Sequence, residues 1–218
     1  MNNWETFYKN IEVRNDDLKD SKFGPIPKGW EVKKLKDCLD EFNCKSTEND
    51  QHEVFTSSAK GLIRQTDYFG ANRITRRDTK GFNIIPIKYL TYRSRSDSNA
   101  FYFNQNDLGK IGLVSKYYPV FKAKDGIELN KFFVFLLNYY SEIISQESVG
   151  TSQVVLSYKA LSNIQLPIPP LKEQFRISCI LESIEELIKK KVQKLNGLIN
   201  LQNALTKDLL SGRRKVKI

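Results

Sequence analysis

A proline-free stretch near the C-terminus constrains the fold of this chain more than any other feature. Between Leu171 and Ser211 the sequence has no proline and one interior glycine, Gly197. The run Pro167-Ile168-Pro169-Pro170 comes directly before it, and proline is well tolerated in the first turn of a helix. Gly212 stands where a helix-terminating glycine usually lies. The pattern predicts one helix of about 41 residues, roughly 60 Å long at 1.5 Å per residue.

Apolar residues follow a 4-3 spacing along this helix, which is typical of a coiled-coil seam. Lys191 and Gln202 interrupt the spacing, and polar seam residues can fix register and partner choice. A preceding domain of about 145 residues has a radius of gyration of roughly 15 Å, too small to cover the whole stripe. We therefore expect a partner helix, and the sequence shows no second helix of this length. The predicted partner-helix residues are Ile177, Leu181, Ile184, Ile188, Leu195, Leu198, Leu205 and Leu209.

The charges along the helix indicate the direction of pairing. An acidic block, Glu182, Glu185 and Glu186, is followed by a basic block at 189–194. Antiparallel pairing of two such helices brings the acidic block of one near the basic block of the other, whereas parallel pairing stacks like charges. We expect antiparallel pairing, although each exposed ion pair contributes only tenths of a kcal/mol. Packing of the helix on its own domain is the less favoured alternative.

A second feature is a basic region between Lys60 and Arg95. It holds nine cations against two acidic residues, in a chain whose net charge is +10. Cations bind phosphate, and the forked donors of arginine read bases in the major groove. An ordinary solvated face is the alternative for the cations, a half-buried core position for the tyrosines, and turn formation for the loop at 151–153. The predicted DNA-binding residues are Lys60, Arg64, Tyr68, Arg73, Arg76, Arg77, Lys80, Tyr92, Arg93, Arg95, Ser96, Asn99, Thr151 and Gln153.

The rest of the chain predicts a mixed α+β domain over residues 25–169. Short strand patterns alternate with one apolar helical pattern at 130–145. We expect an N-terminal arm at 1–24, the long helix at 170–212 and a basic tail at 213–218. The predicted strands cover 30–35, 82–87, 90–92, 101–103 and 111–114, and a short helix is expected at 35–42.

Signatures of catalysis, metal binding and membrane insertion are missing from the sequence. Three cysteines and one histidine, His52, form no zinc-binding pattern, and there is no phosphate-binding loop or dinucleotide fingerprint. Asp20, Glu31 and Lys33 match an acidic nuclease spacing only superficially. No apolar run approaches the roughly 20 residues that span a bilayer, and the start lacks a secretory pattern. We expect a cytoplasmic protein that has no cofactor and is not an enzyme.

Four sequence motifs resemble the specificity subunits of type I restriction-modification systems. The segment 166–174, LPIPPLKEQ, is similar to the "P-P-L-x-E-Q" start of the family's long spacer helix. The segment 209–216, LLSGRRKV, is similar to that helix's "L-L-T/S-G-x-x-x-V" ending. The segment 23–32, FGPIPKGWEV, resembles the family's "G-x-I-P-x-G-W-x-V" start of a target-recognition domain. Gly150-Thr151-Ser152-Gln153 resembles the polar loop near the end of such domains.

The resemblance implies one target-recognition domain followed by one spacer helix. Members of the family usually carry two of each on one chain, so this chain resembles half a subunit. The resemblance implies double-stranded DNA as a partner, together with itself or another half subunit through antiparallel helices. It also implies DNA adenine methyltransferase subunits, which carry out the chemistry, and a restriction endonuclease subunit. The alternatives are a stand-alone DNA-binding regulator that dimerises by its coiled coil, and a coiled-coil adaptor that binds only protein.

Overall fold

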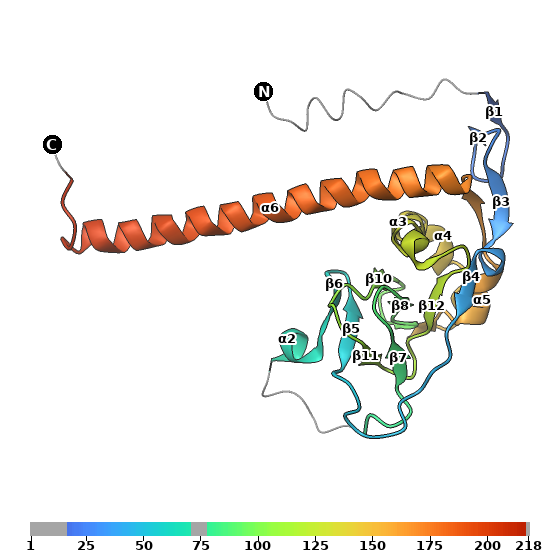
Figure 1. Ribbon diagram of the computed structural model, residues 1–218, viewed down its shortest axis with the longest axis horizontal. Helices are drawn as coiled ribbons and strands as arrows, with labels where there is room; N and C mark the ends of the chain where they lie inside the picture. The colour runs from blue at the N-terminus through green and yellow to red at the C-terminus, as the bar shows by residue number, and fades with distance from the viewer. Residues whose placement is uncertain (1–16, 71–77, 217–218) are drawn as a thin grey trace. The chain divides into compact units, whose positions relative to one another are not determined.

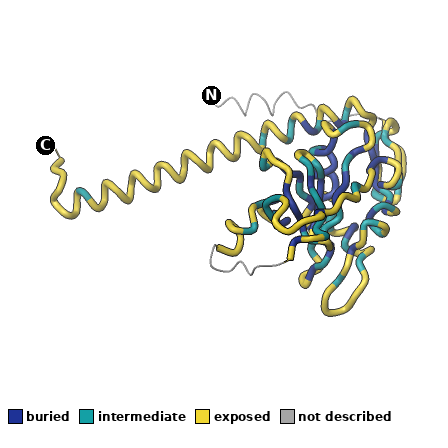
Figure 2. Tube along the Cα trace, turned by 60° about the horizontal axis from the view of Figure 1, so that its bottom comes forward, coloured by how far each residue is buried: buried dark blue, intermediate teal, exposed yellow. Residues whose placement is uncertain are grey.

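The computed structural model describes residues 17–70 and 78–216 (Figure 1). The chain divides into two compact units, one ending at Gln174 and the other beginning at Phe175. The first unit contains the strands and short helices, and the second contains most of one long helix. Buried positions gather among the strands of the first unit (Figure 2). The predicted α+β fold class with a long C-terminal helix is therefore confirmed.

The two ends of the first unit meet in a strand pair. β3 (Glu31–Lys34) pairs antiparallel with β14 (Gln165–Ile168), with Glu31 opposite Ile168. A smaller pair precedes it, in which β1 (Leu18–Lys19) runs antiparallel to β2 (Ile26–Pro27). β1 lies at the end of the predicted arm, so this part of the arm is paired with the start of the domain.

A four-stranded antiparallel sheet forms the centre of the first unit, in the order β10-β8-β12-β4. All three residues of β8 are buried, as expected for a strand covered on both faces. β4 and β10 lie at the edges, where unpaired backbone groups need other partners. The strands are β4 (Leu39–Glu41), β8 (Leu90–Tyr92), β10 (Phe103–Gln105) and β12 (Val120–Ala123).

Two asparagines of the helix α3 (Asn130–Tyr139) supply partners for backbone groups of this sheet and its connections. Asn138 accepts from the backbone N–H of Phe103 (3.0 Å) and donates to its carbonyl (2.8 Å). The fully buried Asn130 accepts from the N–H of Ala123 and donates to the carbonyl of Lys88. Because buried backbone groups must be hydrogen-bonded, these amides fix α3 against the sheet.

The helical pattern at 130–145 forms two helices rather than one. α3 (Asn130–Tyr139) is separated from α4 (Ser141–Ser145) at Tyr140, whose ψ of 18° leaves the helical range. Three further short helical elements lie in the first unit. They are the 3-10 turns η1 (Leu35–Asp37) and η3 (Ile127–Leu129) and the helix α5 (Tyr158–Asn163).

Three two-stranded ribbons surround the central sheet, all antiparallel. A short helix, α2 (Gln65–Phe69), follows directly after β6. The ribbons pair β5 (Phe55–Ser58) with β6 (Gly61–Arg64), β7 (Asn83–Ile85) with β11 (Gly112–Val114), and β9 (Arg95–Ser96) with β13 (Val154–Val155).

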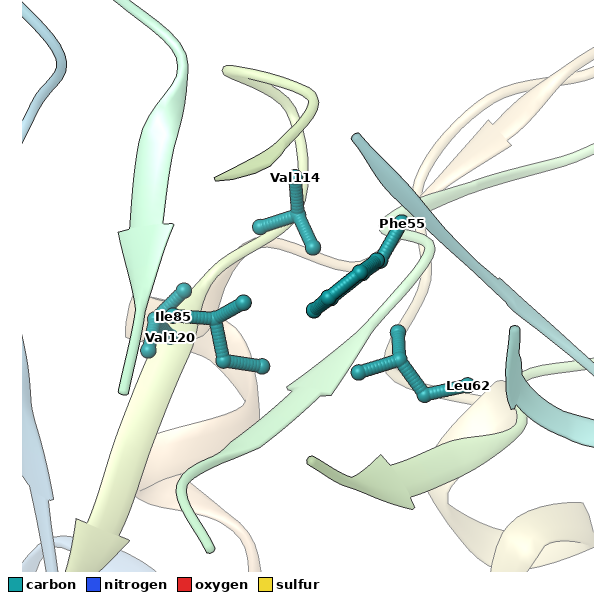
Figure 3. Close-up of a cluster of buried hydrophobic side chains, with 5 residues drawn as sticks. All are labelled: Phe55, Leu62, Ile85, Val114 and Val120. Carbon is teal, nitrogen blue, oxygen red and sulfur yellow. The ribbon is translucent and has the colours of Figure 1, made fainter. Parts of the chain in front are cut away.

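A cluster of apolar side chains joins two of these ribbons, β5–β6 and β7–β11, to β12 of the central sheet (Figure 3). Its members are all buried: Phe55, Leu62, Ile85, Val114 and Val120. Gly112 permits this packing, because a Cβ atom at that position would lie 2.1 Å from the Phe55 ring. Burial of a side chain as large as phenylalanine contributes roughly 1.5–3 kcal/mol, so this cluster holds the ribbons in place.

The long helix α6 (Leu171–Leu210) is present as predicted. Gly212 adopts a φ of +72°, and its N–H donates to the carbonyl of Leu209, so the helix ends at the expected glycine. The seam residues Ile188, Leu195, Leu198, Leu205 and Leu209 are exposed, and Ile177, Leu181 and Ile184 are half-buried.

Two short elements differ from the sequence-based predictions. The helix expected at 35–42 is a single turn, η1, followed by strand β4, because residues 39–41 pair with β12. The strand expected at 101–103 begins at Phe103, which lies opposite Tyr92 in the central sheet. In both places the non-local pairing decides the local structure.

Candidate nucleic-acid interface

Two adjoining hollows, which we call the arginine cleft, lie beside β5, α2 and the segment 93–98. Their volumes are about 260 and 330 Å³. They share four lining residues: Ser57, Tyr68, Arg93 and Arg95. The cleft thus combines two arginines, an aromatic ring and a hydroxyl, a set of groups suited to a polar, anionic ligand with flat faces.

Strand alternation places the side chains of the segment 92–97. Successive side chains of an extended chain point to opposite faces. Tyr92, Ser94 and Ser96 are buried, and of these three only Ser96 reaches the cleft, whereas Arg93, Arg95 and Asp97 all line it. The two arginines and the aspartate therefore share one face.

The Arg95 guanidinium is held against an aromatic ring. Its central carbon lies 3.8 Å from the centroid of the Tyr117 ring. The backbone around Tyr117 is also tied to this segment, because the Ser94 hydroxyl donates to the Tyr117 carbonyl. Stacking leaves the planar edge of a guanidinium free to donate, and a stacked group loses less conformational entropy when it binds. Arg95 is thus a preorganised bidentate donor.

Asp97 connects the segment 93–98 to a loop more than 50 residues later in the chain. Its Oδ1 accepts a hydrogen bond from Gln153 Nε2 at 2.8 Å. Its Oδ2 lies 3.9 Å from Arg93 Nη2, close enough for an ion pair but too far for a hydrogen bond. The carboxylate is therefore paired with two of the predicted DNA-binding side chains.

The loop that carries Gln153 is closed by backbone pairing. The N–H and C=O groups of Val149 and Val155 exchange hydrogen bonds of 3.0 and 2.8 Å. Gly150 has a φ of +135°, and a Cβ atom there would lie 2.3 Å from the Gln153 carbonyl oxygen. A glycine at this position is thus required for the loop to close and to direct Gln153 toward Asp97.

The structure brings together five of the residues predicted to bind DNA. Each of them lines at least one hollow of the arginine cleft: Tyr68, Arg93, Arg95, Ser96 and Gln153. Lys60, Arg64, Lys80, Asn99 and Thr151 are not among its described lining residues. Arg64 lies instead 3.7 Å from the carboxylate of Glu53. Arg73, Arg76 and Arg77 lie outside the described residues.

The prediction that Tyr92 binds DNA is wrong, because its side chain has no exposed surface. Its hydroxyl donates to the Leu156 carbonyl at 2.9 Å, and its ring packs on Phe103. Burial raises the pKa of this phenol far above its usual range. Tyr92 is thus a core residue and not a contact for a ligand. Ser96 lines the cleft, but its hydroxyl accepts from the N–H of Ala100 and shapes the turn that follows β9.

Several lining residues were missed by the sequence-based prediction. Tyr117 and Ser115 come from the turn before β12, Ser57 and Ser58 from the β5–β6 ribbon, and Asp97 from the turn after β9. The charged region alone gives no sign of the first four, since they lie outside it. The alternation Arg-Ser-Arg-Ser-Asp at 93–97 does carry a signal for Asp97, because it places the aspartate on the arginine face.

Searches of the described residues for two other kinds of site found none. In residues 17–70 and 78–216, no group of three or more His, Cys, Asp or Glu side chains is arranged to hold a metal ion. In the same ranges, no helix combines the length and apolarity needed to cross a membrane.

The fold defines a class of protein, an α+β domain continued by a long helix with an exposed apolar seam. Comparison with known sequences identifies the family within that class. The type I restriction modification DNA specificity domain matches residues 27–198. The chain belongs to this family.

Curated relatives agree with that assignment. The chain is 25% identical to the type I restriction enzyme MjaVIII specificity subunit of Methanocaldococcus jannaschii, over 92% of this chain and 50% of that protein. It is 26% identical to the MjaIX specificity subunit of the same organism, over 90% and 44%. The chain thus spans about half the length of the curated relatives it matches.

Two solved structures share the fold. The S subunit of a type I restriction-modification system from M. genitalium superposes with a TM-score of 0.59 at 15% identity, covering 92% of this chain and 48% of that one. A chain from a study of complex assembly and conformational transition of the type I R-M system gives a TM-score of 0.54 at 18% identity, with coverages of 94% and 49%.

Proposed function

We propose that this chain is a DNA specificity subunit that reads one half of a bipartite site in double-stranded DNA. The observation that carries this proposal is the shared face of Arg93 and Arg95 in the arginine cleft, with Gln153 beside them. Arginine donates in bidentate fashion to guanine and glutamine to adenine in the major groove. Arg95, stacked on Tyr117, is the best prepared of these side chains and is our candidate guanine reader.

Other cations of the basic region supply the sequence-independent part of binding. Lys60, Arg64 and Lys80 lie on the same stretch of chain as the cleft arginines and are exposed. The net charge of +10 favours a polyanion. Each phosphate contact releases counterions, so affinity should fall steeply as salt rises. In this proposal these residues position the DNA, and the cleft reads it.

The long helix pairs with the helix of a second copy in antiparallel orientation. In support, Leu195 and Leu198 are more than half exposed, and a contiguous exposed apolar row of this kind marks an interaction surface. The order of charges, with Glu186 before Lys190, favours the antiparallel arrangement. Two recognition domains held this way read two half-sites separated by an unread spacer, whose length the helices set.

The chain itself acts without catalysis, and its partners carry the chemistry. DNA adenine methyltransferase subunits dock on the paired subunits and methylate adenine, and a restriction endonuclease subunit joins for cleavage. The family assignment supports both partners. A homodimer recognises a palindromic, gapped sequence because its two half-sites are related by the two-fold axis.

The decisive experiment is co-expression of this chain with its adenine methyltransferase subunit in a methylation-free host. Methylated adenines are then mapped by long-read sequencing. A palindromic gapped motif is expected, and an asymmetric gapped motif would replace the homodimer with a mixed pair. A soluble complex that methylates nothing would contradict the proposal and favour a stand-alone DNA-binding regulator.

A further inference from the structure

Asp97 is the one carboxylate among the described residues that line the arginine cleft. Its neighbours there are arginines, serines and aromatic residues. Arginine has no hydrogen-bond acceptor, and a carboxylate has no donor. Asp97 therefore has the opposite chemical character from the two arginines on the same face. A negative charge in a DNA-binding cleft repels phosphate, so its presence requires a separate explanation.

The position of this carboxylate is fixed on both sides. The Ser96 hydroxyl accepts from the N–H groups of Ser98 (3.3 Å) and Ala100 (3.0 Å), which closes the turn. Asn99 adopts a left-handed φ of 54°, and its amide oxygen lies 3.0 Å from the Ser148 hydroxyl. Pairing of β9 with β13 joins the turn to the loop of Gln153. These hydrogen bonds hold the backbone of Asp97 in place. A side chain that discriminates between ligands needs such a fixed position.

Asp97 also keeps acceptor capacity for a ligand. Its side chain is 70% exposed, and the hydrogen bond from Gln153 engages only Oδ1. Arg93, at 3.9 Å from Oδ2, is an ion-pair partner without a hydrogen bond. A carboxylate accepts about four hydrogen bonds, so Oδ2 can take a donor from a bound molecule.

Only base amino groups offer such a donor in the major groove. Cytosine presents N4 and adenine presents N6, whereas the guanine O6 and thymine O4 atoms are acceptors that a carboxylate repels. We propose that Asp97 is a specificity-determining residue, which accepts a hydrogen bond from the amino group of one cytosine or adenine and rejects guanine and thymine at that position. This inference rests on the proposed function, because it names what one side chain of the same site reads.

The hydrogen bond between Gln153 and Asp97 has a second consequence for base selection. Because Gln153 donates to Oδ1 of Asp97, the aspartate holds the amide while its Oδ2 keeps the capacity to accept a hydrogen bond. The two side chains come from different loops but read as one unit, so they should govern the same or adjacent base pairs. The charge of Asp97 also weakens binding to DNA that places no amino group at that position, which raises the ratio of specific to non-specific affinity.

The test compares Asp97→Asn with Asp67→Asn in the full chain, bound to its methyltransferase subunit. Both substitutions remove one negative charge, but Asp67 lies on α2 outside the cleft lining. Each complex selects from a randomised double-stranded DNA library. Asp97→Asn should lower the selectivity for an amino-bearing base at one position of each half-site by at least about fivefold, because the amide also offers a donor and no longer rejects guanine and thymine. Asp67→Asn should leave the motif unchanged and alter only overall affinity.

A second variant, Asp97→Glu, keeps the acceptor and should keep an amino-bearing base at that position with weaker selection. A motif that is identical in the wild type and in Asp97→Asn would overturn the role of Asp97 while leaving the proposed function intact. Loss of selection at every position in both Asp97 variants, with unchanged thermal unfolding, would also overturn it. A wild-type complex that selects no motif would instead refute the proposed function, and this inference with it.

Discussion

The indole N–H of Trp30 donates to the carboxylate of Glu173 at 3.2 Å, across 143 residues of sequence. Trp30 belongs to the motif that starts the domain, and Glu173 to the motif that starts the long helix. The pairing of β3 with β14 explains the contact, since Trp30 precedes one strand and Glu173 follows the other. A carboxylate in the first turn also suits the positive end of the helix. The two most recognisable motifs of the sequence thus form a single structural joint.

Replacing Trp30 with phenylalanine should weaken this joint. The variant keeps an aromatic ring but removes the N–H donor, and loss of such a hydrogen bond costs about 1–2 kcal/mol of unfolding free energy. Urea unfolding of the purified chain measures the change. Tyr139→Phe is the matched control, because Tyr139 is 79% exposed and its hydroxyl can be lost without cost. Equal stability of the two variants would contradict a role for the Trp30 contact.

Gly150→Ala should disorganise the loop that presents Gln153. A Cβ atom would collide with the Gln153 carbonyl, and the φ of +135° is strained for any other residue. The expected cost is roughly 1–3 kcal/mol, measured by thermal unfolding, with reduced base selectivity in the DNA selection assay. Gly29→Ala is the control, since no heavy atom lies within 4 Å of its added Cβ. A Gly150 variant as selective as the wild type would show that the loop does not position Gln153.

Local signals in the sequence predicted the long helix well and the central domain less well. The helix is set by proline at its start, glycine at its end and periodic leucines, all of which are local features. The helix expected at 35–42 failed because β4 pairs with β12, and sequence periodicity does not reveal a partner about 80 residues away. The break at Tyr140 was likewise invisible, because the apolar spacing continues through it.

The candidate site was predicted in part for the same reason. The charged stretch predicted Arg93 and Arg95 as site residues. Within so long a segment, the alternation of side chains that buries Tyr92 was not recognised. Tyr117 comes to the cleft only through the folding of distant strands, and Gln153 was predicted only because its loop resembles the polar loop of the family. A candidate site read from one basic segment therefore contains the charges but lacks the groups that orient them.

Cys38 should react more slowly with alkylating agents than Cys44 or Cys179. Cys38 is buried and the other two thiols are exposed, and burial raises the pKa of the Cys38 thiol. Since the thiolate is the reactive form, alkylation of Cys38 in the native chain should be at least about tenfold slower. Peptide mapping by mass spectrometry measures all three rates in one sample.

The raised pKa of the Cys38 thiol also makes the free energy of unfolding depend on pH. The pKa of Cys38 is higher in the folded than in the unfolded chain, so its contribution to stability is complete below the unfolded value of about 8.5. That contribution is lost as the pH rises through the folded value. The free energy of unfolding should therefore fall at alkaline pH, which urea unfolding at several pH values measures. Native alkylation of Cys38 at the rate of Cys44 would contradict its burial.

Arg95→Lys should reduce base selectivity while preserving charge. Lysine lacks the planar fork that donates to guanine and cannot stack on Tyr117 as a guanidinium does. Selectivity at one base pair should fall by about tenfold, with little change in binding to unrelated DNA. Arg64→Lys is the control, because Arg64 lies outside the described lining of the cleft and a phosphate contact survives the exchange. Unequal motifs are expected for the two variants, and an unchanged motif in Arg95→Lys would remove Arg95 from base readout.

Charged residues in the seam of α6 should separate the paired subunits. Multi-angle light scattering of the wild type should give about twice the chain mass of 25.3 kDa, and Leu195→Glu with Leu198→Glu should give the chain mass. Each leucine contributes roughly 1.5–3 kcal/mol when covered, so the double variant should weaken pairing at least about a hundredfold.

Leu210→Glu is the control that distinguishes the loss of apolar contacts in the seam from the effect of an added charge. Leu210 is 84% exposed and lies off the 4-3 spacing, so this variant should keep the wild-type mass. An equal loss of mass in both variants would show that charge alone disrupts the assembly. A wild type that is already a monomer at micromolar concentration would contradict self-pairing. The exposed seam would then be covered by the helix of a different chain, and the methylated motif would be asymmetric.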